Sequence, residues 1–435
     1  MAAYIYADQE YGISIATSLD EQFGDLRIAM AAYSSFVRDV PRLDIFGIGI
    51  GGSVLSEIVK DGNALYFGGC DKNVYCVSDQ GELLWRFQTN GLCVSPSVAN
   101  GKVFIGSFDE NFYCISTEGR LLWKFETNGP IASKPCIFGG KVCFGSKDAN
   151  VYCLSEEGRL LWKFRTHGAI TQDPVFNDGL IYMGSDDSAL YVIDAESGGL
   201  VRKIMSNGAF STPVISDGIL YVGCFDRNFY AFTLEGRELW RYKHNAAMGI
   251  RRPLLHDGVV FGCCRDGSVY GLSVDGRLYR KYVTNELLWV TPVTDGERLY
   301  FGSGDGNFYA FGIRTGKVEW KFPIKGIISS TACLDNGVLY FGGWDAHLYA
   351  ITTEGRLLWK FRLSMATPAA IEPEEEFRST VQSQVVWRVG EESDSGAAKK
   401  KDAEADISDY GAFSGTYIDT GKPDYVTGAK RGKYR

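Results

Sequence analysis

The sequence predicts an all-β protein built from eight repeated units, and two observations carry this prediction. The first is a period: an aspartate followed four residues later by a tyrosine recurs every 38 to 40 residues. The second is that each unit has four short apolar runs separated by turn-forming residues, the pattern of four β-strands. A period of this kind defines a repeat array. The eight pairs are Asp71/Tyr75, Asp109/Tyr113, Asp148/Tyr152, Asp187/Tyr191, Asp226/Tyr230, Asp266/Tyr270, Asp305/Tyr309 and Asp345/Tyr349.

The second unit shows how one repeat is built. Asn100 and Gly101 separate its first two runs and favour a tight hairpin turn, because both residues tolerate a positive φ. Asp109, in the next break, can accept hydrogen bonds from backbone amides. The unit is therefore expected to be an antiparallel meander. Its four runs are Leu92–Ala99, Val103–Gly106, Asn111–Ile115 and Leu121–Phe125. The third break of each unit has a glycine, namely Gly81, Gly119, Gly158, Gly198, Gly236, Gly276, Gly316 or Gly355.

Prolines and tryptophans indicate how the meanders are arranged. A proline in the expected first strand predicts that this strand lies at a sheet edge, where no N–H is needed. A tryptophan in the fourth strand buries roughly 150–250 Å² and is expected to hold neighbouring sheets together. Since one small sheet cannot bury both faces, we expect radial stacking into an eight-bladed β-propeller over residues 46–365. The prolines are Pro96, Pro135, Pro174, Pro213, Pro253 and Pro292. The tryptophans are Trp85, Trp123, Trp162, Trp240, Trp320 and Trp359.

The unit G-S-x-D-x-N-x-Y, followed by a glycine turn and x-x-W-K-F, resembles the quinoprotein (PQQ) propeller repeat. The tryptophan-docking motif of that family reads roughly A-x-D-x-x-T-G-K-x-x-W. The resemblance covers residues 50–363 and implies an eight-bladed propeller, as in quinoprotein dehydrogenases and the outer-membrane assembly lipoprotein of the family. Many proteins with this repeat bind no quinone and act as interaction platforms, so the fold alone does not decide the function. The seventh unit is most similar to the motif, through Ala310, Thr315, Gly316, Lys317 and Trp320.

Composition excludes some classes of function. Hydrophobic residues make up 45% and charged residues 23% of the 435 residues, as in soluble globular proteins. The net charge of −8 disfavours a general nucleic-acid binder, whose surface would be basic. Met1–Glu10 lacks the basic start and apolar core of a signal peptide. The 11 cysteines, an odd number, indicate reduced thiols, so we expect a cytoplasmic protein without a membrane span.

Segments outside the repeats carry further expectations. Residues 1–45 are expected to form a short α/β extension with one helix at Leu19–Val40, which packs on the propeller or binds a partner. Residues 366–390 contain one more expected strand, Ser379–Val389. Residues 391–435 combine a polar linker with an aromatic and basic tail. We expect this tail to be partly disordered and able to contact a protein, nucleic acid or an anionic surface.

Two units depart from the repeat. The fourth unit has Arg202 and the sixth has Arg280 where the other units have tryptophan. The sixth also has Cys263 where other units have glycine. We expect weaker contacts at these two junctions. Two interpretations remain open: sequence drift at two blade junctions, or a partner or ligand site there.

The expected central channel supplies the candidate ligand-binding residues. They stand just before the inner-strand prolines, where neighbouring blades approach the axis. Strand alternation lets only about half of them face the channel. A mixed polar lining of this kind can bind a small ligand or can simply be filled with water. The candidates are Lys134, Gln172, Asp173, Arg251, Arg252 and Trp289.

Catalytic chemistry is not indicated. The four histidines share no spacing typical of a metal or nucleophile system, and no loop is of the phosphate-binding kind. The family resemblance implies that a quinoprotein dehydrogenase would hold Ca²⁺ on a Glu, Asn and Asp set and often carry a disulfide between adjacent cysteines. Cys263 and Cys264 are adjacent, but the calcium set cannot be placed on this sequence. The sequence therefore predicts no catalytic residue, no metal site and no cofactor.

Three hypotheses for function remain. The first is a non-catalytic cytoplasmic propeller that serves as a protein–protein interaction scaffold or as a subunit of an assembly. Its contacts would come from a propeller face, the N-terminal helix or the C-terminal tail. The second is a dehydrogenase dependent on PQQ and Ca²⁺. The third is a sensor that binds a small ligand in the central channel.

Overall fold

The structure is a computed structural model that describes residues 4–7, 13–16, 53–246, 251–284 and 286–363. The expected helix at Leu19–Val40, the expected strand at Ser379–Val389 and the tail at 391–435 lie outside the described residues. In the N-terminal extension, β1 (Tyr4–Ala7) pairs antiparallel with β2 (Ile13–Ala16). The remaining described residues form β-sheets, and no helix occurs in this part of the chain.

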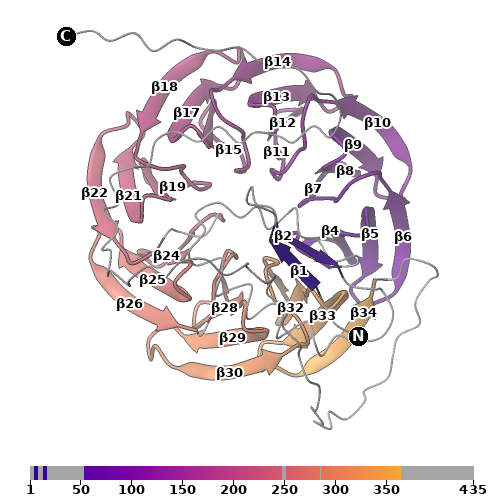
Figure 1. Ribbon diagram of the computed structural model, residues 1–435, viewed down its shortest axis with the longest axis vertical. Coiled ribbons are helices and arrows are strands. Elements are labelled where there is room, and N and C mark those ends of the chain that lie inside the picture. The colour runs from indigo at the N-terminus through magenta and orange to yellow at the C-terminus, as the bar shows by residue number, and fades with distance from the viewer. Residues whose placement is uncertain (1–3, 8–12, 17–52, 247–250, 285, 364–435) are drawn as a thin grey trace, which may run out of the picture. The chain divides into compact units, whose positions relative to one another are not determined.

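Eight four-stranded sheets are arranged as a ring of blades, as Figure 1 shows. Blade 1 is β3 (Val59–Asp61), β4 (Ala64–Gly68), β5 (Asn73–Ser78) and β6 (Leu83–Gln88). Blade 2 is β7 (Ser97–Ala99), β8 (Lys102–Gly106), β9 (Asn111–Ser116) and β10 (Leu121–Glu126). Blade 3 is β11 (Cys136–Phe138), β12 (Lys141–Gly145), β13 (Asn150–Ser155) and β14 (Leu160–Arg165). Blade 4 is β15 (Val175–Asn177), β16 (Leu180–Ser185), β17 (Ala189–Asp194) and β18 (Leu200–Met205).

The second half of the ring repeats this arrangement. Blade 5 is β19 (Val214–Ser216), β20 (Ile219–Gly223), β21 (Asn228–Thr233) and β22 (Glu238–Lys243). Blade 6 is β23 (Leu254–His256), β24 (Val259–Cys263), β25 (Ser268–Ser273) and β26 (Leu278–Val283). Blade 7 is β27 (Val293–Thr294), β28 (Arg298–Gly302), β29 (Asn307–Gly312) and β30 (Val318–Pro323). Blade 8 is β31 (Cys333–Asp335), β32 (Val338–Gly342), β33 (His347–Thr352) and β34 (Leu357–Arg362).

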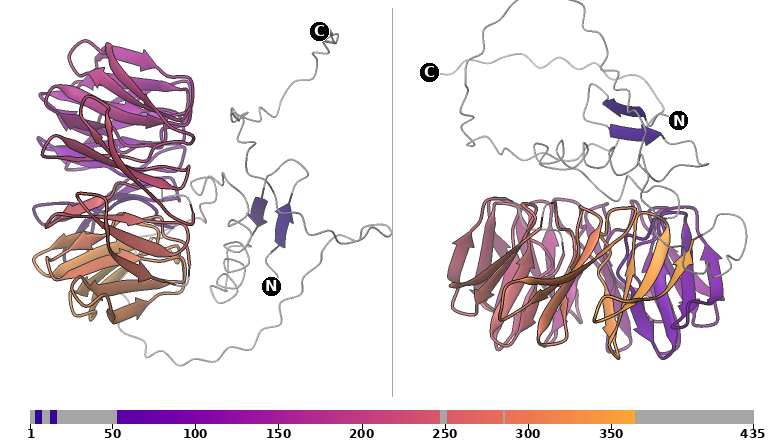
Figure 2. Two further views of the ribbon diagram at one scale, coloured as in Figure 1. Left: turned by 90° about the vertical axis from the view of Figure 1, so that its left-hand side faces the viewer. Right: turned by 90° about the horizontal axis from the view of Figure 1, so that it is seen from below.

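Every blade is an antiparallel meander in which strands pair in chain order from the innermost to the outermost. The predicted eight-bladed propeller is therefore confirmed. The edge-on views in Figure 2 show the blades of the ring side by side. Blades 1 and 8 are each built from consecutive strands, so the ring closes without the exchange of a strand.

Turn chemistry explains the local register. Asn100 has φ 52° and Gly101 has φ 71°, so the two-residue hairpin between β7 and β8 has the positive φ values predicted for it. The glycine of the third turn is also in the left-handed region, with Gly119 at φ 85°. A bulge follows in each outermost pair, as between Leu121 and Trp123 of β10. The bulge increases the local twist of the outer strand.

The first strand is shorter than predicted. Leu92–Ala99 was expected as one strand, but β7 begins at Ser97, directly after Pro96. The residues before the proline bond to two different blades, because Cys93 N donates to Gly69 O of blade 1 and Val94 N donates to Gly106 O of blade 2. They are therefore a connection between blades and not part of one sheet. The prolines precede the inner strands, where the fixed φ is tolerated and no ladder hydrogen bond is lost.

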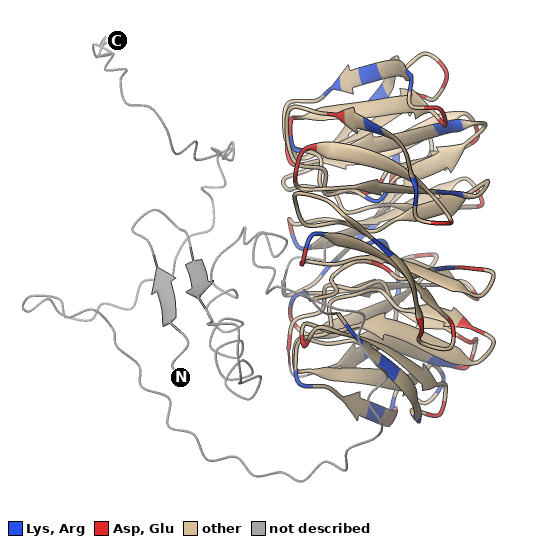
Figure 3. Cartoon of the chain, turned by 90° about the vertical axis from the view of Figure 1, so that its right-hand side faces the viewer, with Lys and Arg blue, Asp and Glu red and all other residues tan. Residues whose placement is uncertain are grey.

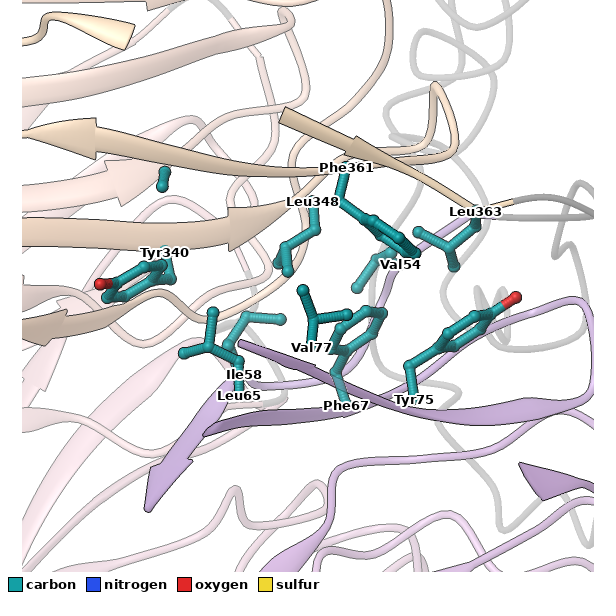
Figure 4. Close-up of a cluster of buried hydrophobic side chains, with 11 residues drawn as sticks. Val54, Ile58, Leu65, Phe67, Tyr75, Val77, Tyr340, Leu348, Phe361 and Leu363 are labelled. Carbon is teal, nitrogen blue, oxygen red and sulfur yellow. The ribbon is translucent and has the colours of Figure 1, made fainter. Parts of the chain in front are cut away.

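The core lies between neighbouring blades. Phe112 of blade 2 stacks on Phe144 of blade 3 with ring centroids 4.0 Å apart, and both side chains are fully buried. The same arrangement closes the ring in Figure 4, where Val77 and Phe67 of blade 1 pack with Leu348 of blade 8. Aromatic pairs of this kind add roughly 0.5–1.5 kcal/mol beyond their buried area. Packing between side chains therefore holds the blades together at every junction, including the closing one.

Candidate functional site

The tryptophans of the outer strands span the junctions between blades. The Nε1 of Trp85 in blade 1 donates to Thr117 O of blade 2 over 2.7 Å. Its indole lies against Gly119, where an added Cβ would come within 2.7 Å of Trp85 Cγ. Gly119 is thus required both for its positive φ and for the close approach of the ring. The other indoles also donate to a carbonyl of the next blade: Trp123 to Glu156, Trp162 to Ala195, Trp240 to Val274, Trp320 to Thr353 and Trp359 to Asp79.

The two arginines that replace tryptophan take the same place. Arg202 Nη1 donates to Leu234 O over 2.5 Å, and Arg280 Nη2 donates to Arg314 O over 2.9 Å. The Cδ of Arg202 lies 3.1 Å from the position of a Cβ on Gly236, the glycine of that turn. A guanidinium can reach this carbonyl because its stem is long and its donors are planar. The junctions therefore keep the hydrogen bond and lose the indole.

The repeated aspartate and tyrosine also have a structural role. In each of the eight pairs the tyrosine hydroxyl donates to the aspartate four residues before it, as Tyr113 does to Asp109 over 2.8 Å. Asp109 also accepts hydrogen bonds from the backbone amide of Asn111 over 3.0 Å and from that of Asn90 over 2.8 Å. Asn90 lies in the preceding connection between blades. Burial acts to raise the pKa of Asp109, but these hydrogen bonds hold it below its usual value. The carboxylate thus fixes one loop and the connection beside it.

A row of basic residues was missed by the sequence analysis. One stands directly after the tryptophan or arginine of each outer strand, opposite the repeated tyrosine in the register, as Lys124 is opposite Tyr113. Lys203 Nζ lies 4.8 Å above the ring of Tyr191 and 3.6 Å from Asp187. The W-K-F motif contains this basic residue, but its spacing in the sequence does not identify the tyrosine and aspartate that it contacts. The row is Arg86, Lys124, Lys163, Lys203, Arg241, Lys281, Lys321 and Lys360.

The channel candidates belong to a chain of contacts between neighbouring blades. Lys134 N donates to Asp173 Oδ1 over 2.7 Å, and Asp173 N donates to Thr212 Oγ1 over 2.9 Å. The same bond occurs from Glu57 N to Ser95 Oγ and from Thr291 N to Thr331 Oγ1. In each case the acceptor side chain is at the equivalent position of the next blade. The polar residues before the prolines therefore tie the inner ends of the blades together.

Two of the charged candidates bond to the segment that leads into blade 1. Lys134 Nζ lies 2.8 Å from Glu57 Oε1, and Arg251 Nη2 donates to Leu55 O over 3.2 Å. Burial raises the pKa of Asp173, and the positive charges of Arg251 and Lys134 oppose that effect. Burial also acts to raise the pKa of Glu57, but the charge and hydrogen bond of Lys134 together with the charges of Arg252 and Arg251 lower it overall. The structure thus brings together Lys134, Asp173 and Arg251.

The other candidates contribute differently. Thr291 Oγ1 donates to the backbone carbonyl of Arg252, so Arg252 takes part in the contacts between blades through its backbone. Gln172 and Trp289 are buried, each with 2% of its surface exposed. Gln172 Oε1 and Trp289 Nε1 have no hydrogen-bond partner among the described residues. These two side chains are thus enclosed in the blade walls.

A hollow of about 360 Å³ lies beside Lys134, between the inner strands of the first three blades. Its lining is mixed, with apolar groups from Val59, Val98, Ala99 and Ile137 and polar groups that include those of Ser97 and Lys134. This size is at the lower end of small-molecule sites.

Acidic, histidine and cysteine side chains do not gather as a metal site within the described part of the chain. Cys263 and Cys264 are both buried, free thiols. Burial raises the pKa of Cys264 to about 12, which keeps the thiol protonated and unreactive. No helix among the described residues is long and apolar enough to cross a membrane.

Comparison with known proteins agrees with this architecture. The model of a family described as outer membrane protein assembly factor BamB matches residues 70–168, 147–286 and 265–396. No curated protein matches the chain.

Two of the solved structures that are similar to this chain illustrate the shared fold. The computationally designed Ika8 protein has 15% identity and a TM-score of 0.63, over 70% of this chain and 97% of its own. BamB from Moraxella catarrhalis has 16% identity and a TM-score of 0.57, over 72% of this chain and 95% of its own. At sequence identities this low, the two structures support only the fold of this chain. Since the family model matches well over half of the residues, the chain belongs to the PQQ-repeat propeller family described as outer membrane protein assembly factor BamB.

Proposed function

We propose that this chain is a non-catalytic propeller that serves as a protein–protein interaction scaffold or as a subunit of an assembly. One observation carries the proposal. Of 16 large hydrophobic side chains that are exposed among the described residues, 14 lie on the outermost strands. These side chains are spread over all eight outermost strands, so the exposed apolar surface follows the whole rim of the ring, and exposed apolar surface can mark a protein interaction site. The rim of the ring is therefore the surface best suited to a partner.

The polar residues of the repeat support this proposal indirectly. The repeated aspartates, tyrosines and tryptophans bond to the loops and blades beside them, and charged channel residues pair with one another. These contacts stabilise the ring. They assign no repeated side chain a role in catalysis. The family description as an assembly factor supports a role in binding other proteins.

The test is affinity purification from the native host under gentle conditions, with the full chain and with a form truncated after Glu391. A stoichiometric partner on the full chain supports the proposal. Loss of that partner on truncation would place the contact in the aromatic and basic tail. If neither form retains a partner, the scaffold function is wrong, and absorbance spectra with added PQQ and Ca²⁺ would then test the dehydrogenase alternative.

The hollow beside Lys134 favours one second candidate, a sensor of small ligands. A mixed polar and apolar lining that includes the amine of Lys134 suits a small anion with an apolar body. Thermal unfolding with a library of such anions tests this, since a ligand at 100 times its Kd stabilises by about 2.7 kcal/mol. A shift that disappears in Lys134→Met would support the sensor, and the absence of any shift would contradict it.

We further propose a cytoplasmic location. All 11 cysteines are free and eight of them are buried, which suits a reducing compartment. Cell fractionation of the native host with detection of the untagged chain tests this directly. Recovery of the chain with the membrane or periplasmic fraction would contradict it.

A further inference from the structure

Blade 3 carries three cysteines in one row across its strands. Cys136 of β11 is opposite Cys143 of β12, and Cys143 is opposite Cys153 of β13. Figure 1 shows these strands side by side. All three residues are free thiols. Because residues that are directly opposite in a sheet point to the same face, the thiol of Cys143 has a second thiol on either side of it.

The register makes Cys143 and Cys153 the closer pair. Ser146 N donates to Asn150 O over 3.0 Å at the end of this hairpin. Hydrogen-bonded and non-hydrogen-bonded pairs alternate along an antiparallel ladder, so Cys143 and Cys153, three residues further along, are a non-hydrogen-bonded pair. The Cα atoms of such a pair are about 4.5 Å apart, which a disulfide can span. The thiol of Cys143 is also hydrogen-bonded to that of Cys153.

Comparison of the eight blades shows that Cys143 is the unusual member of this pair. In blades 1 and 2, Cys76 and Cys114 stand where Cys153 does, but they are opposite an aromatic residue. Cys153 is thus a common residue of the repeat, and Cys143 is the substitution that creates a pair of thiols. An aromatic residue takes the place of Cys143 in each of the other blades: Tyr66, Phe104, Tyr182, Tyr221, Phe261, Tyr300 and Tyr340.

The pair lies in an enclosed, apolar part of the blade. Cys143 and Cys153 are fully buried, and the cluster around them includes Ile181, Met183 and Trp162. Burial, together with the hydrogen bond to Cys153, raises the pKa of Cys143, so its thiol stays protonated in the absence of an oxidant. Figure 3 shows charged residues on the outer strands and in the loops of the side that it draws. An oxidant that reaches this core must therefore be small and uncharged, as hydrogen peroxide is.

From these observations we infer that Cys143 and Cys153 are a redox-sensitive pair that closes to a cross-strand disulfide when hydrogen peroxide is present. One sulfur attacks the peroxide, its O–O bond breaks, and a sulfenic acid and one water form. The second sulfur then attacks the sulfenic sulfur, an S–S bond forms, and a second water leaves. The two thiols lose two protons and two electrons, and the peroxide takes up both.

The geometry of the pair makes this bond reversible. The Cβ atoms of directly opposite residues are about 4.5 Å apart or more, whereas a relaxed disulfide holds them at about 3.8 Å. Closing the bond therefore strains the two strands, and strained disulfides are the ones that reductants open readily. The pair is thus suited to a switch rather than to a permanent crosslink.

The switch would act on the junction with blade 4. Cys153 is opposite Trp162 of β14, and the indole of Trp162 donates to Ala195 O of blade 4. Both residues belong to the same buried cluster as the two thiols. A bond between β12 and β13 therefore changes the packing beneath the tryptophan that joins blades 3 and 4. This inference does not depend on the proposed scaffold function.

The experiment treats the full chain with hydrogen peroxide, alkylates the remaining thiols under denaturing conditions and locates disulfides by peptide mass spectrometry. The test variant is Cys153→Ala. The matched control is Cys114→Ala, which removes the equivalent cysteine of blade 2, where the opposite residue is Phe104. Alanine stands at this position in blades 5, 7 and 8, so both variants should fold, and their unfolding midpoints check this.

Trypsin cleaves after Lys147 and so separates the peptides of Cys143 and Cys153. We expect these two peptides to be linked in the treated wild type and in the control, and to separate again with dithiothreitol. The test variant should lose the linked species. Free thiols at both positions, under a treatment that converts the exposed Met205 to its sulfoxide, would overturn the inference. Oxidation to sulfinic or sulfonic acid, or linkage of Cys143 to a different cysteine, would also overturn it.

Discussion

Two junctions that share blade 4 show which part of the repeat motif the fold can change. At the junction with blade 3, Trp162 donates to Ala195 O over 3.1 Å and its indole lies on Gly198. At the junction with blade 5, Arg202 donates to Leu234 O over 2.5 Å and its stem lies on Gly236. The hydrogen bond to the carbonyl is kept and the aromatic surface is replaced. An unpaired buried carbonyl is more costly than a smaller apolar contact, which explains the difference.

The largest expected effect comes from removing the indole. Trp162→Ala should lower the free energy of unfolding by about 3–5 kcal/mol, because a nearly buried ring leaves a cavity and an unpaired carbonyl. Arg202→Ala should cost about 1–3 kcal/mol, since it loses mainly one charged hydrogen bond. Urea unfolding of both variants measures the two values. Equal losses would show that the two junctions do not differ as described.

A smaller effect is expected at the glycines under the rings. Gly158 has φ 84°, and an added Cβ would lie 2.7 Å from Trp123 Cδ2. Gly179 has φ 77° and nothing within 4 Å of an added Cβ. Gly179→Ala should therefore cost about 1–2 kcal/mol from backbone strain alone.

Gly158→Ala should cost about 1 kcal/mol more than this control, because the indole must also move. The difference between the two unfolding free energies isolates the contact with the ring. If the two substitutions have the same effect, the close approach of the indole does not contribute to stability.

Restoring the repeat should have an effect of opposite sign. Arg202→Trp gives blade 4 the residue of its neighbours, and it should stabilise by about 1 kcal/mol, as consensus substitutions commonly do. The thermal unfolding midpoint measures this gain. Destabilisation would show that the junction with blade 5 is built specifically around the guanidinium.

The smallest expected effect concerns acid. Although burial opposes it, hydrogen bonding lowers the pKa of Asp109, so its ionised form is favoured in the folded state. Its contribution is therefore present above the ordinary pKa of aspartate and is lost as the pH falls through the lower folded value. For Asp71, burial raises the pKa, so the protonated form is favoured in the folded state and the ionised form opposes folding.

Asp109→Asn should cost roughly 1 kcal/mol or less at pH 7, and the difference from wild type should shrink as the pH falls below about 4. For Asp71→Asn, the difference in unfolding free energy from wild type should not shrink as the pH falls. Unfolding in urea across this pH range measures both. A constant difference for Asp109→Asn would contradict the assigned hydrogen bonds.

The architecture was predictable because a period repeated eight times averages out local ambiguity. Strands, turns and their glycines follow from residue type and spacing, as Asn100, Gly101 and Gly119 show. The first strand was predicted too long because Leu92–Val94 has the composition of a strand, although its hydrogen bonds go to two blades. Pairing between blades depends on distances across the ring, which no local pattern contains.

The candidate site was less predictable for the same reason. The sequence places Lys134, Asp173 and Arg251 near the axis, but it does not show that Glu57 pairs with Lys134. The last residue of the outer strand is Met205 in blade 4 and Val283 in blade 6, the blades in which Arg202 and Arg280 replace tryptophan. Their exposure, 58% for Met205 and 59% for Val283, required the structure.

The central claim is that this propeller works by holding another protein. The most direct test is the mass of the native species in a gentle extract, measured by light scattering after size-exclusion chromatography. The account predicts a species heavier than the chain by a stoichiometric partner. A species with only the mass of the chain itself at every salt concentration would contradict the account.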